Sequence, residues 1–121
     1  MDSEEKLCFT ILDVNKYARY AAVCDSEGKI LSDCNRDNVE HLLSKEETNE
    51  SLKRAIDSWH HRDKLSAKIG KGRCAIVGYE NLIRITIPLK NEHLLLVTVD
   101  GKKPEYMSDV LSIVDFVEEF L

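Results

Sequence analysis

The sequence lacks a long hydrophobic run and has no excess of positive charge. Its longest apolar runs, such as Leu94–Val97, are far too short to cross a bilayer. A net charge of -5 argues against nucleic acid as a ligand, because binding to phosphates requires a basic face that displaces counterions. The first residues, Met1–Lys6, are acidic and lack the hydrophobic core of a signal peptide. These absences predict a cytoplasmic protein that binds neither nucleic acid nor a membrane.

Closely spaced cysteines are also missing. The four cysteines are Cys8, Cys24, Cys34 and Cys74, and no two of them form a C-x-x-C pair. Zinc sites usually take two ligands from one tight turn, so we expect no metal site. Cys24 and Cys34 flank a predicted turn and would allow a disulfide. In a cytoplasmic protein, reduced thiols that pack as small apolar side chains are the favoured interpretation.

The composition is that of a folded, water-soluble chain. Of 121 residues, 43% are hydrophobic and 32% are charged, without repeats or low-complexity stretches. A chain of this length is typical of one domain, which we expect to cover residues 1–121.

The first part of the chain predicts a helix followed by a β-hairpin. Leu7 and Ile11 recur at helical spacing in a segment whose N-terminal end is acidic, which complements the helix dipole. Two extended stretches follow, Tyr17–Asp25 and Ile30–Cys34. The turn between them contains Gly28, which accepts a positive φ.

The middle of the chain predicts helical structure. Asp37 or Asn38 is suited to cap a short helix whose apolar residues are Val39, Leu42 and Leu43. Ser44–Glu47 has the pattern of a capping box, which starts the main helix.

The apolar face of this main helix consists of Leu52, Ala55, Ile56 and Trp59. The pattern continues less regularly to Ile69, which allows a kink between Trp59 and Leu65, and glycines end it at 70 and 72.

Three strands and a helix complete the predicted order. The strands are Arg73–Tyr79, Leu82–Leu89 and His93–Val99, joined by short connections that suit an antiparallel meander. The last strand is apolar on both faces, because Leu94 and Leu96 oppose equally apolar neighbours. It should therefore lie at the centre of the sheet with helices on either side. A wide apolar helical stripe follows Ser108.

This α-β-β-α-β-β-β-α order resembles the roadblock/dynein-light-chain superfamily and its profilin-like relatives. Ala21–Leu31 is similar to the first hairpin of that family, in which a hydrophobic strand enters an acidic turn with glycine. The resemblance implies an α+β fold with a five-stranded antiparallel sheet of order 2-1-5-4-3. The first and last helices would cover one face and the middle helix the other. The middle helical region is longer and more polar than in a typical roadblock domain.

A second resemblance covers nearly the whole chain. Leu42–Glu47, Ile69–Lys71, Tyr79–Glu80, Ile85–Leu89 and Leu94–Val99 resemble a family of small archaeal proteins, chiefly of ammonia-oxidising archaea. This resemblance implies no activity.

Nothing in the sequence has the pattern of a catalytic site. His60 and His61 are adjacent on a helix and point about 100° apart, so they are poorly placed to share an ion. His41 and Cys34 would approach each other near the hairpin exit, but a nucleophile also needs an orienting group and an oxyanion site. We therefore expect no enzyme and no cofactor. The roadblock resemblance implies a protein-interaction module, dimeric, that regulates a small GTPase or signalling partner.

Six residues are candidates for function. Trp59, Tyr79, Arg84 and Cys74 are expected to line an interface or a ligand site. The alternative to the interaction module is a PAS- or GAF-like small-ligand sensor, in which the same residues would line a cavity of about 300 Å³ or more.

Lys71 and Arg73 are the candidates for contact with an acidic partner. The surrounding Gly-Lys-Gly-Arg run resembles a phosphate loop only superficially, because it closes a helix and opens a strand.

Overall fold

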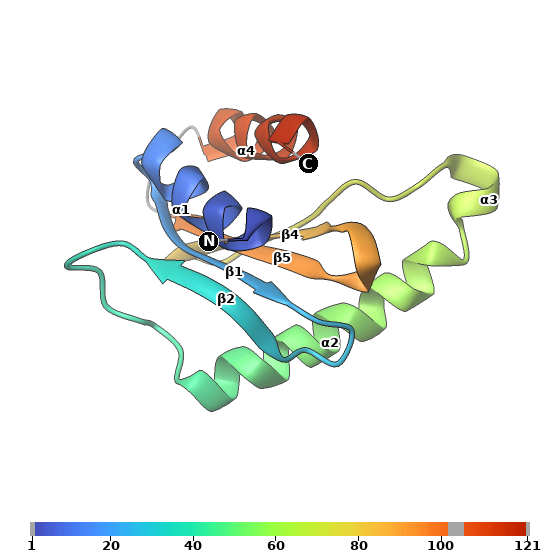
Figure 1. The fold of residues 1–121 in the computed structure, drawn as a ribbon, viewed down its shortest axis with the longest axis horizontal. Coiled ribbons are helices and arrows are strands. Elements are labelled where there is room, and N and C mark those ends of the chain that lie inside the picture. Colours follow the sequence, from blue (N-terminus) through green and yellow to red (C-terminus); the bar gives the residue numbers. More distant parts are fainter. Residues whose placement is uncertain (1, 102–105, 121) are drawn as a thin grey trace.

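The computed structural model describes residues 2–101 and 106–120 and contains one five-stranded antiparallel sheet with helices on both faces (Figure 1). The strands are β1 (Ala18–Cys24), β2 (Ile30–Asn35), β3 (Ala75–Gly78), β4 (Leu82–Pro88) and β5 (Leu94–Asp100). The helices are α1 (Ser3–Val14), α2 (Lys45–Asp63), α3 (Ser66–Ile69) and α4 (Tyr106–Phe120), with a 3-10 turn η1 (Lys90–Glu92) between β4 and β5.

The strand order is β2-β1-β5-β4-β3, which confirms the predicted topology. β5 pairs with β1 on one side and with β4 on the other. Leu94 and Leu96 are buried on one face of β5, and Leu95 and Val97 are buried on the other. The burial of both faces places β5 at the centre, as its composition predicted.

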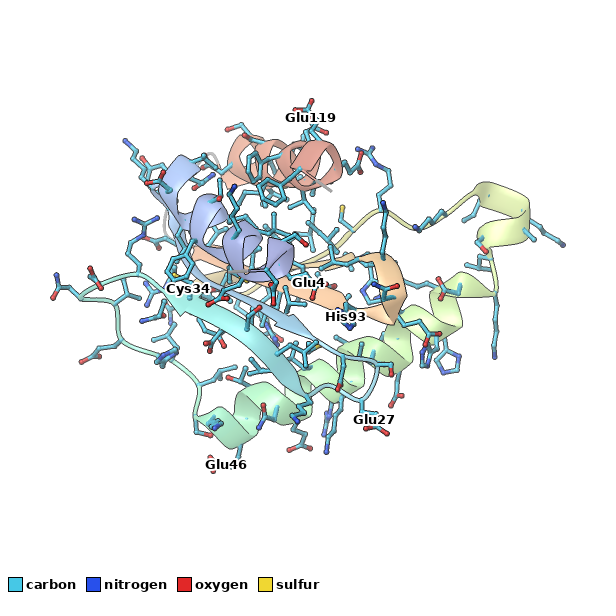
Figure 2. The ribbon with its side chains drawn as sticks, in the orientation of Figure 1. Glu4, Glu27, Cys34, Glu46, His93 and Glu119 are labelled. Carbon is cyan, nitrogen blue, oxygen red and sulfur yellow. The ribbon has the colours of Figure 1, made fainter. Side chains whose placement is uncertain are left out.

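α1 and α4 cover one face of the sheet (Figure 1). Leu7 and Ile11 of α1 are fully buried there, as are Val110 and Ile113 of α4. On α1, Glu4 also reaches the start of β5, where a carboxylate oxygen lies 2.7 Å from Nδ1 of His93 (Figure 2).

α2 crosses the other face (Figure 1). Its capping box is present: the Ser44 hydroxyl accepts from the Glu47 amide at 3.1 Å, and the Glu47 carboxylate accepts from the Ser44 amide at 2.9 Å. Leu52, Ile56 and Trp59 are buried against the sheet. The helix start and its apolar face are therefore as predicted.

The short helix predicted at 37–43 is wrong. Residues 36–43 form an irregular loop, in which Asn38 has a φ of 63°. The Asn35 side chain donates to the carbonyls of Arg36 and Val39, and these bonds replace helical hydrogen bonds.

α2 is shorter than the pattern suggested. It ends at Asp63, and a turn at Lys64 leads into the separate four-residue α3. This break lies in the segment where the sequence allowed a kink. α3 projects beyond the sheet (Figure 1), and Leu65 and Ile69 there are 55% and 79% exposed. Gly70 ends α3 with a φ of 93°, as expected of a C-terminal glycine.

Candidate functional site

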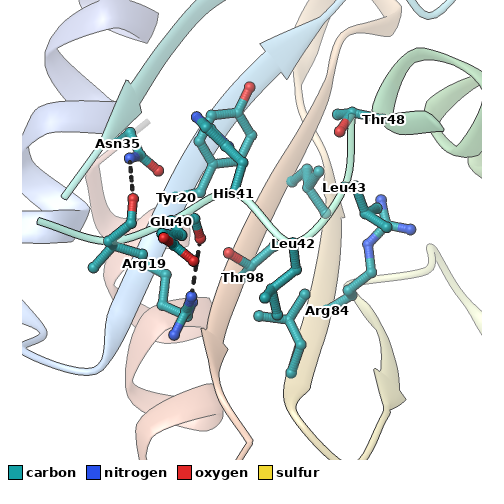
Figure 3. Close-up of a pocket in the computed structure, with 13 residues that line it drawn as sticks. Arg19, Tyr20, Asn35, Glu40, His41, Leu42, Leu43, Thr48, Arg84 and Thr98 are labelled. Atoms are coloured by element: carbon teal, nitrogen blue, oxygen red, sulfur yellow. Dashed lines mark hydrogen bonds between the residues drawn. The ribbon is translucent and has the colours of Figure 1, made fainter. Parts of the chain in front are cut away.

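A row of polar residues crosses the α2 face of the sheet. Strand register places Asn35 opposite Tyr20, Tyr20 opposite Thr98, and Thr98 opposite Arg84, so four adjacent strands contribute to one line. In the next row, Ala22, Leu96 and Thr86 lie side by side beneath α2. The loop at 36–43 lies over the polar row instead (Figure 3).

A small cavity lies between this row and the loop. Its volume is about 40 Å³, and its polar lining includes Arg19, Tyr20, His41, Arg84 and Thr98. In Figure 3, Arg19 and Arg84 lie on opposite sides of Thr98. A space of this size holds about three water molecules.

Arg84 is the half-buried cation of the cavity. Its Nη2 donates to the Ser51 hydroxyl at 2.9 Å. Within residues 2–101 and 106–120, no carboxylate lies within ion-pair distance of this guanidinium. Burial lowers the pKa of Arg84, because the charged form loses solvation without a compensating anion. The site therefore contains a positive charge to which the described residues supply no counter-ion.

The other polar groups of the cavity have partners of their own. Arg19 Nη2 donates to the Glu40 main-chain carbonyl at 3.1 Å. The Tyr20 hydroxyl donates to Asp33 at 2.8 Å, and burial, followed by this bond, raises the pKa of Tyr20. His41 packs edge-on against the Tyr20 ring, with 5.5 Å between centroids.

The structure does not bring the four predicted lining residues into one site. Trp59 belongs to the core under α2, where its indole N–H donates to the Thr86 hydroxyl at 2.9 Å. Cys74 packs against the core on the opposite face of the sheet. Tyr79 follows β3 and is 58% exposed. Arg84 alone of the four lines the cavity.

The two predicted cations on the approach to β3 have different surroundings. Arg73 Nε donates to Glu118 on α4 at 2.6 Å, and Nη2 lies 3.5 Å from Asp115. The bond to Glu118 raises the pKa of Arg73 and lowers that of Glu118. Lys71 is exposed. A partner that contacts Arg73 would therefore compete with α4.

The two thiol arrangements considered from sequence are not formed. Cys34 packs toward α1, whereas Cys24 and the ring that His41 contacts lie on the α2 face. All four cysteines are free.

Residues 2–101 and 106–120 contain neither a metal site nor a membrane-spanning helix. No group of three or more His, Cys, Asp or Glu side chains there is placed to hold a metal ion. No helix there is long and apolar enough to span a membrane.

The sheet has two free edges of different character. The β2 edge has an irregular register with β1 at Val23/Cys24 and carries Asp33. The β3 edge reads Ala-Ile-Val-Gly, without a charge or a proline. Val77 is 49% exposed on it, close to the exposed Tyr79. Bulges and charges protect edges from pairing, so β3 is the less protected edge.

Comparison with known proteins identifies the fold. No protein-family model and no curated protein sequence matches this chain. Among solved structures, the gliding protein MglB from Thermus thermophilus is similar, with a TM-score of 0.75 and 15% identity over 98% of this chain and 85% of that one. A roadblock/LC7 domain from Streptomyces avermitilis has a TM-score of 0.63 and 12% identity, over 96% and 95%. Profilin IA from Acanthamoeba castellanii has a TM-score of 0.62 and 12% identity, over 96% and 94%. The chain therefore has the fold shared by roadblock/LC7 domains and profilin.

Proposed function

We propose that this protein is a non-enzymatic interaction module that forms a homodimer through β3 and α2 and docks on a signalling protein, such as a small GTPase. The observation that carries the proposal is the β3 edge. Its outward main-chain groups have no strand partner among the described residues, and its exposed side chain at Val77 is apolar. An uncharged edge of this kind favours pairing with a second strand.

β3 alone would supply a small interface, because it has only four residues. Two-fold symmetry adds further contacts, since each surface patch is used twice. Antiparallel pairing of two β3 strands would extend the sheet across both copies. The exposed Tyr79 would then lie close to the junction and add aromatic contact area.

The charges of α2 are mixed along its length. Its first half carries Glu46, Glu47 and Glu50 together with Lys45, and its second half carries Arg62 together with Asp57 and Asp63. If two α2 helices pack antiparallel, neither half places charges of a single sign beside the other helix, so the pairing meets no strong like-charge repulsion.

The partner class rests on the roadblock resemblance and on the shared fold, since members of that superfamily scaffold small GTPases and motor complexes. Capture with cross-linking from a native lysate tests it. Recovery of a GTPase or signalling protein supports the proposal. Recovery of metabolic enzymes alone contradicts this partner class and leaves the dimer to be tested separately.

The cavity volume favours this proposal over the ligand sensor. A sensor pocket needs about 300 Å³ or more. The cavity beside Arg84 offers about 40 Å³. A wider groove, between β2 and the first half of α2, has about 1170 Å³, but it is open to solvent and lined by charges of both signs, among them Asp33 and Lys53. Neither space is an enclosed pocket for a whole metabolite.

Light scattering during size-exclusion chromatography tests the dimer. We expect twice the chain mass of 13.8 kDa, maintained over a tenfold dilution in the micromolar range. A strict monomer at high micromolar concentration contradicts the dimer.

A further inference from the structure

We propose that the cavity beneath the 36–43 loop is a binding site for a small oxyanion, a carboxylate or phosphate group, held by Arg84 and Arg19. This site is separate from the β3 edge and does not rest on the proposed dimer. Its basis is the polar row that strand register builds across the sheet, and the charge of the groups around it.

Arg84 is the primary ligand-binding group. A guanidinium has five N–H donors in a planar fork that matches an oxyanion. Only one partner is present for these donors in the described part of the chain, the neutral Ser51 hydroxyl. Keeping a half-buried charge without an anion costs free energy. The sequence retains an arginine there, although the buried Ala22 and Leu96 of the next row show that the same face accepts hydrophobic side chains.

The other residues that line the cavity also favour an anion as the ligand. Arg19 supplies a second cation, and its Nη2 donates to a main-chain carbonyl rather than to a carboxylate. Among the described residues of the lining, Glu40 is the one that bears a carboxylate, and no ion pair joins it to either arginine. Thr98 lies between the two arginines and offers a hydroxyl as a further donor (Figure 3).

The volume of the cavity limits the size of the group that the site binds. About 40 Å³ accommodates one carboxylate or phosphate group but no drug-sized molecule. The rest of a larger ligand would extend from the cavity into solvent past Leu42, which lines the cavity and is 54% exposed. The irregular loop is held by side-chain bonds to its carbonyls and is not a regular element, so its small rearrangements would control access.

The test is a titration of the full chain with acetate and, separately, with inorganic phosphate, followed by ¹H–¹⁵N spectra that include the arginine Nε–H signals. Sodium chloride holds the ionic strength constant, so that general screening does not mimic binding. We expect saturable shifts at Arg84, Thr98 and the 39–43 amides with at least one anion. The two arms show whether the site prefers the planar carboxylate or the phosphate.

Variants distinguish binding at this site from nonspecific binding of anions to surface charges. Arg84→Gln should weaken the binding by about tenfold or more, since a charge-assisted hydrogen bond is lost. Arg54→Gln is the matched control, because Arg54 is 80% exposed on α2 and should leave the affinity unchanged. Absence of saturable shifts with both anions, or equal affinity in Arg84→Gln and wild type, overturns the proposal.

A second variant covers the case in which Arg84→Gln does not fold. Arg84→Lys keeps the charge but loses the fork, so it should bind more weakly than wild type while the arginine control does not. Unfolding without anion gives a further readout. If Arg84 is only structural, Arg84→Gln should lower the thermal midpoint. If Arg84 binds an anion, Arg84→Gln should leave the midpoint unchanged or raise it. Added anion should then raise the midpoint of wild type and of Arg54→Gln but not that of Arg84→Gln.

Discussion

Gly72 lies directly against the Trp59 ring. A Cβ built on Gly72 would lie 2.6 Å from Cζ3 of the indole, closer than real side chains approach. The sequence pattern assigned this glycine to the end of the helical segment, but the close approach of the backbone to the ring gives it a packing role. Arg62 lies on the ring as well, 4.8 Å from its centroid. The tryptophan is therefore enclosed by α2 and by the segment that leads to β3.

We predict that Gly72→Ala destabilises the protein by about 1–3 kcal/mol, because the added methyl forces the Trp59 ring from its position. Urea unfolding measures the change. Gly78→Ala is the control: its Cβ would lie 3.6 Å from Ile83 Cδ1, an ordinary contact, so little loss is expected. Equal stability of wild type and Gly72→Ala would show that the ring moves freely.

Arg36 joins the end of α1 to the start of β1, a role that the sequence did not indicate. Its Nε donates to the Ala18 carbonyl at 2.8 Å, and its Nη2 donates to the carbonyls of Asn15, at 2.8 Å, and Leu12. The last carbonyls of a helix lack amide donors within the helix, and the Arg36 guanidinium supplies donors in their place. We predict that Arg36→Ala costs about 2–3 kcal/mol, measured by chemical unfolding.

Arg54→Ala is the control for this prediction. Arg54 pairs with the exposed Glu50 on α2, at 3.1 Å, and solvent screens that pair. Its removal should change the free energy of unfolding by less than about 0.5 kcal/mol. A loss in Arg36→Ala no larger than in Arg54→Ala would refute the role of Arg36 as a helix-end partner.

The buried thiols predict a loss of stability at alkaline pH. Burial raises the pKa of Cys8 from 9.0 to about 12 and that of Cys24 to about 11. The folded protein then keeps protons that the unfolded chain releases. The free energy of unfolding should be insensitive to these thiols below about pH 9 and should fall as the pH rises from about 9 toward 11.

Urea unfolding at several pH values across this range measures the slope. In Cys24→Ala the alkaline fall should be shallower than in wild type, because one of the two thiols no longer titrates. Identical slopes in the two proteins would mean that Cys24 is not protected from ionisation by the core.

The element order and the central strand were predictable because they depend on local patterns. β5 is apolar on both faces over consecutive residues, Leu94–Val97, and only a central strand buries both. The Ser44–Glu47 capping box is likewise a local signal. The roadblock resemblance supplied the strand order, which these patterns alone do not fix.

The loop and the cavity depend on contacts between distant residues. Val39, Leu42 and Leu43 have helical spacing, but Asn35 and Arg19 bond to the carbonyls of this segment and favour a loop. The polar row needs the register of four strands, including an irregularity between Ala18 and Tyr20 that shifts the pairing of β1 with β5. A sequence pattern does not specify register across a sheet, so Arg84 was named as a candidate without its neighbours.

The most direct test of the interaction module compares two charge substitutions on the two edge strands. Val77 on β3 and Leu31 on β2 are apolar and nearly equally exposed, at 49% and 47%. Sedimentation equilibrium over a tenfold concentration range gives the mass of each variant. We predict that wild type and Leu31→Lys are dimers and that Val77→Lys is a monomer with an intact fold, because lysine protects the β3 edge from pairing. A monomeric wild type, or a dimer that Leu31→Lys disrupts and Val77→Lys does not, would contradict the account.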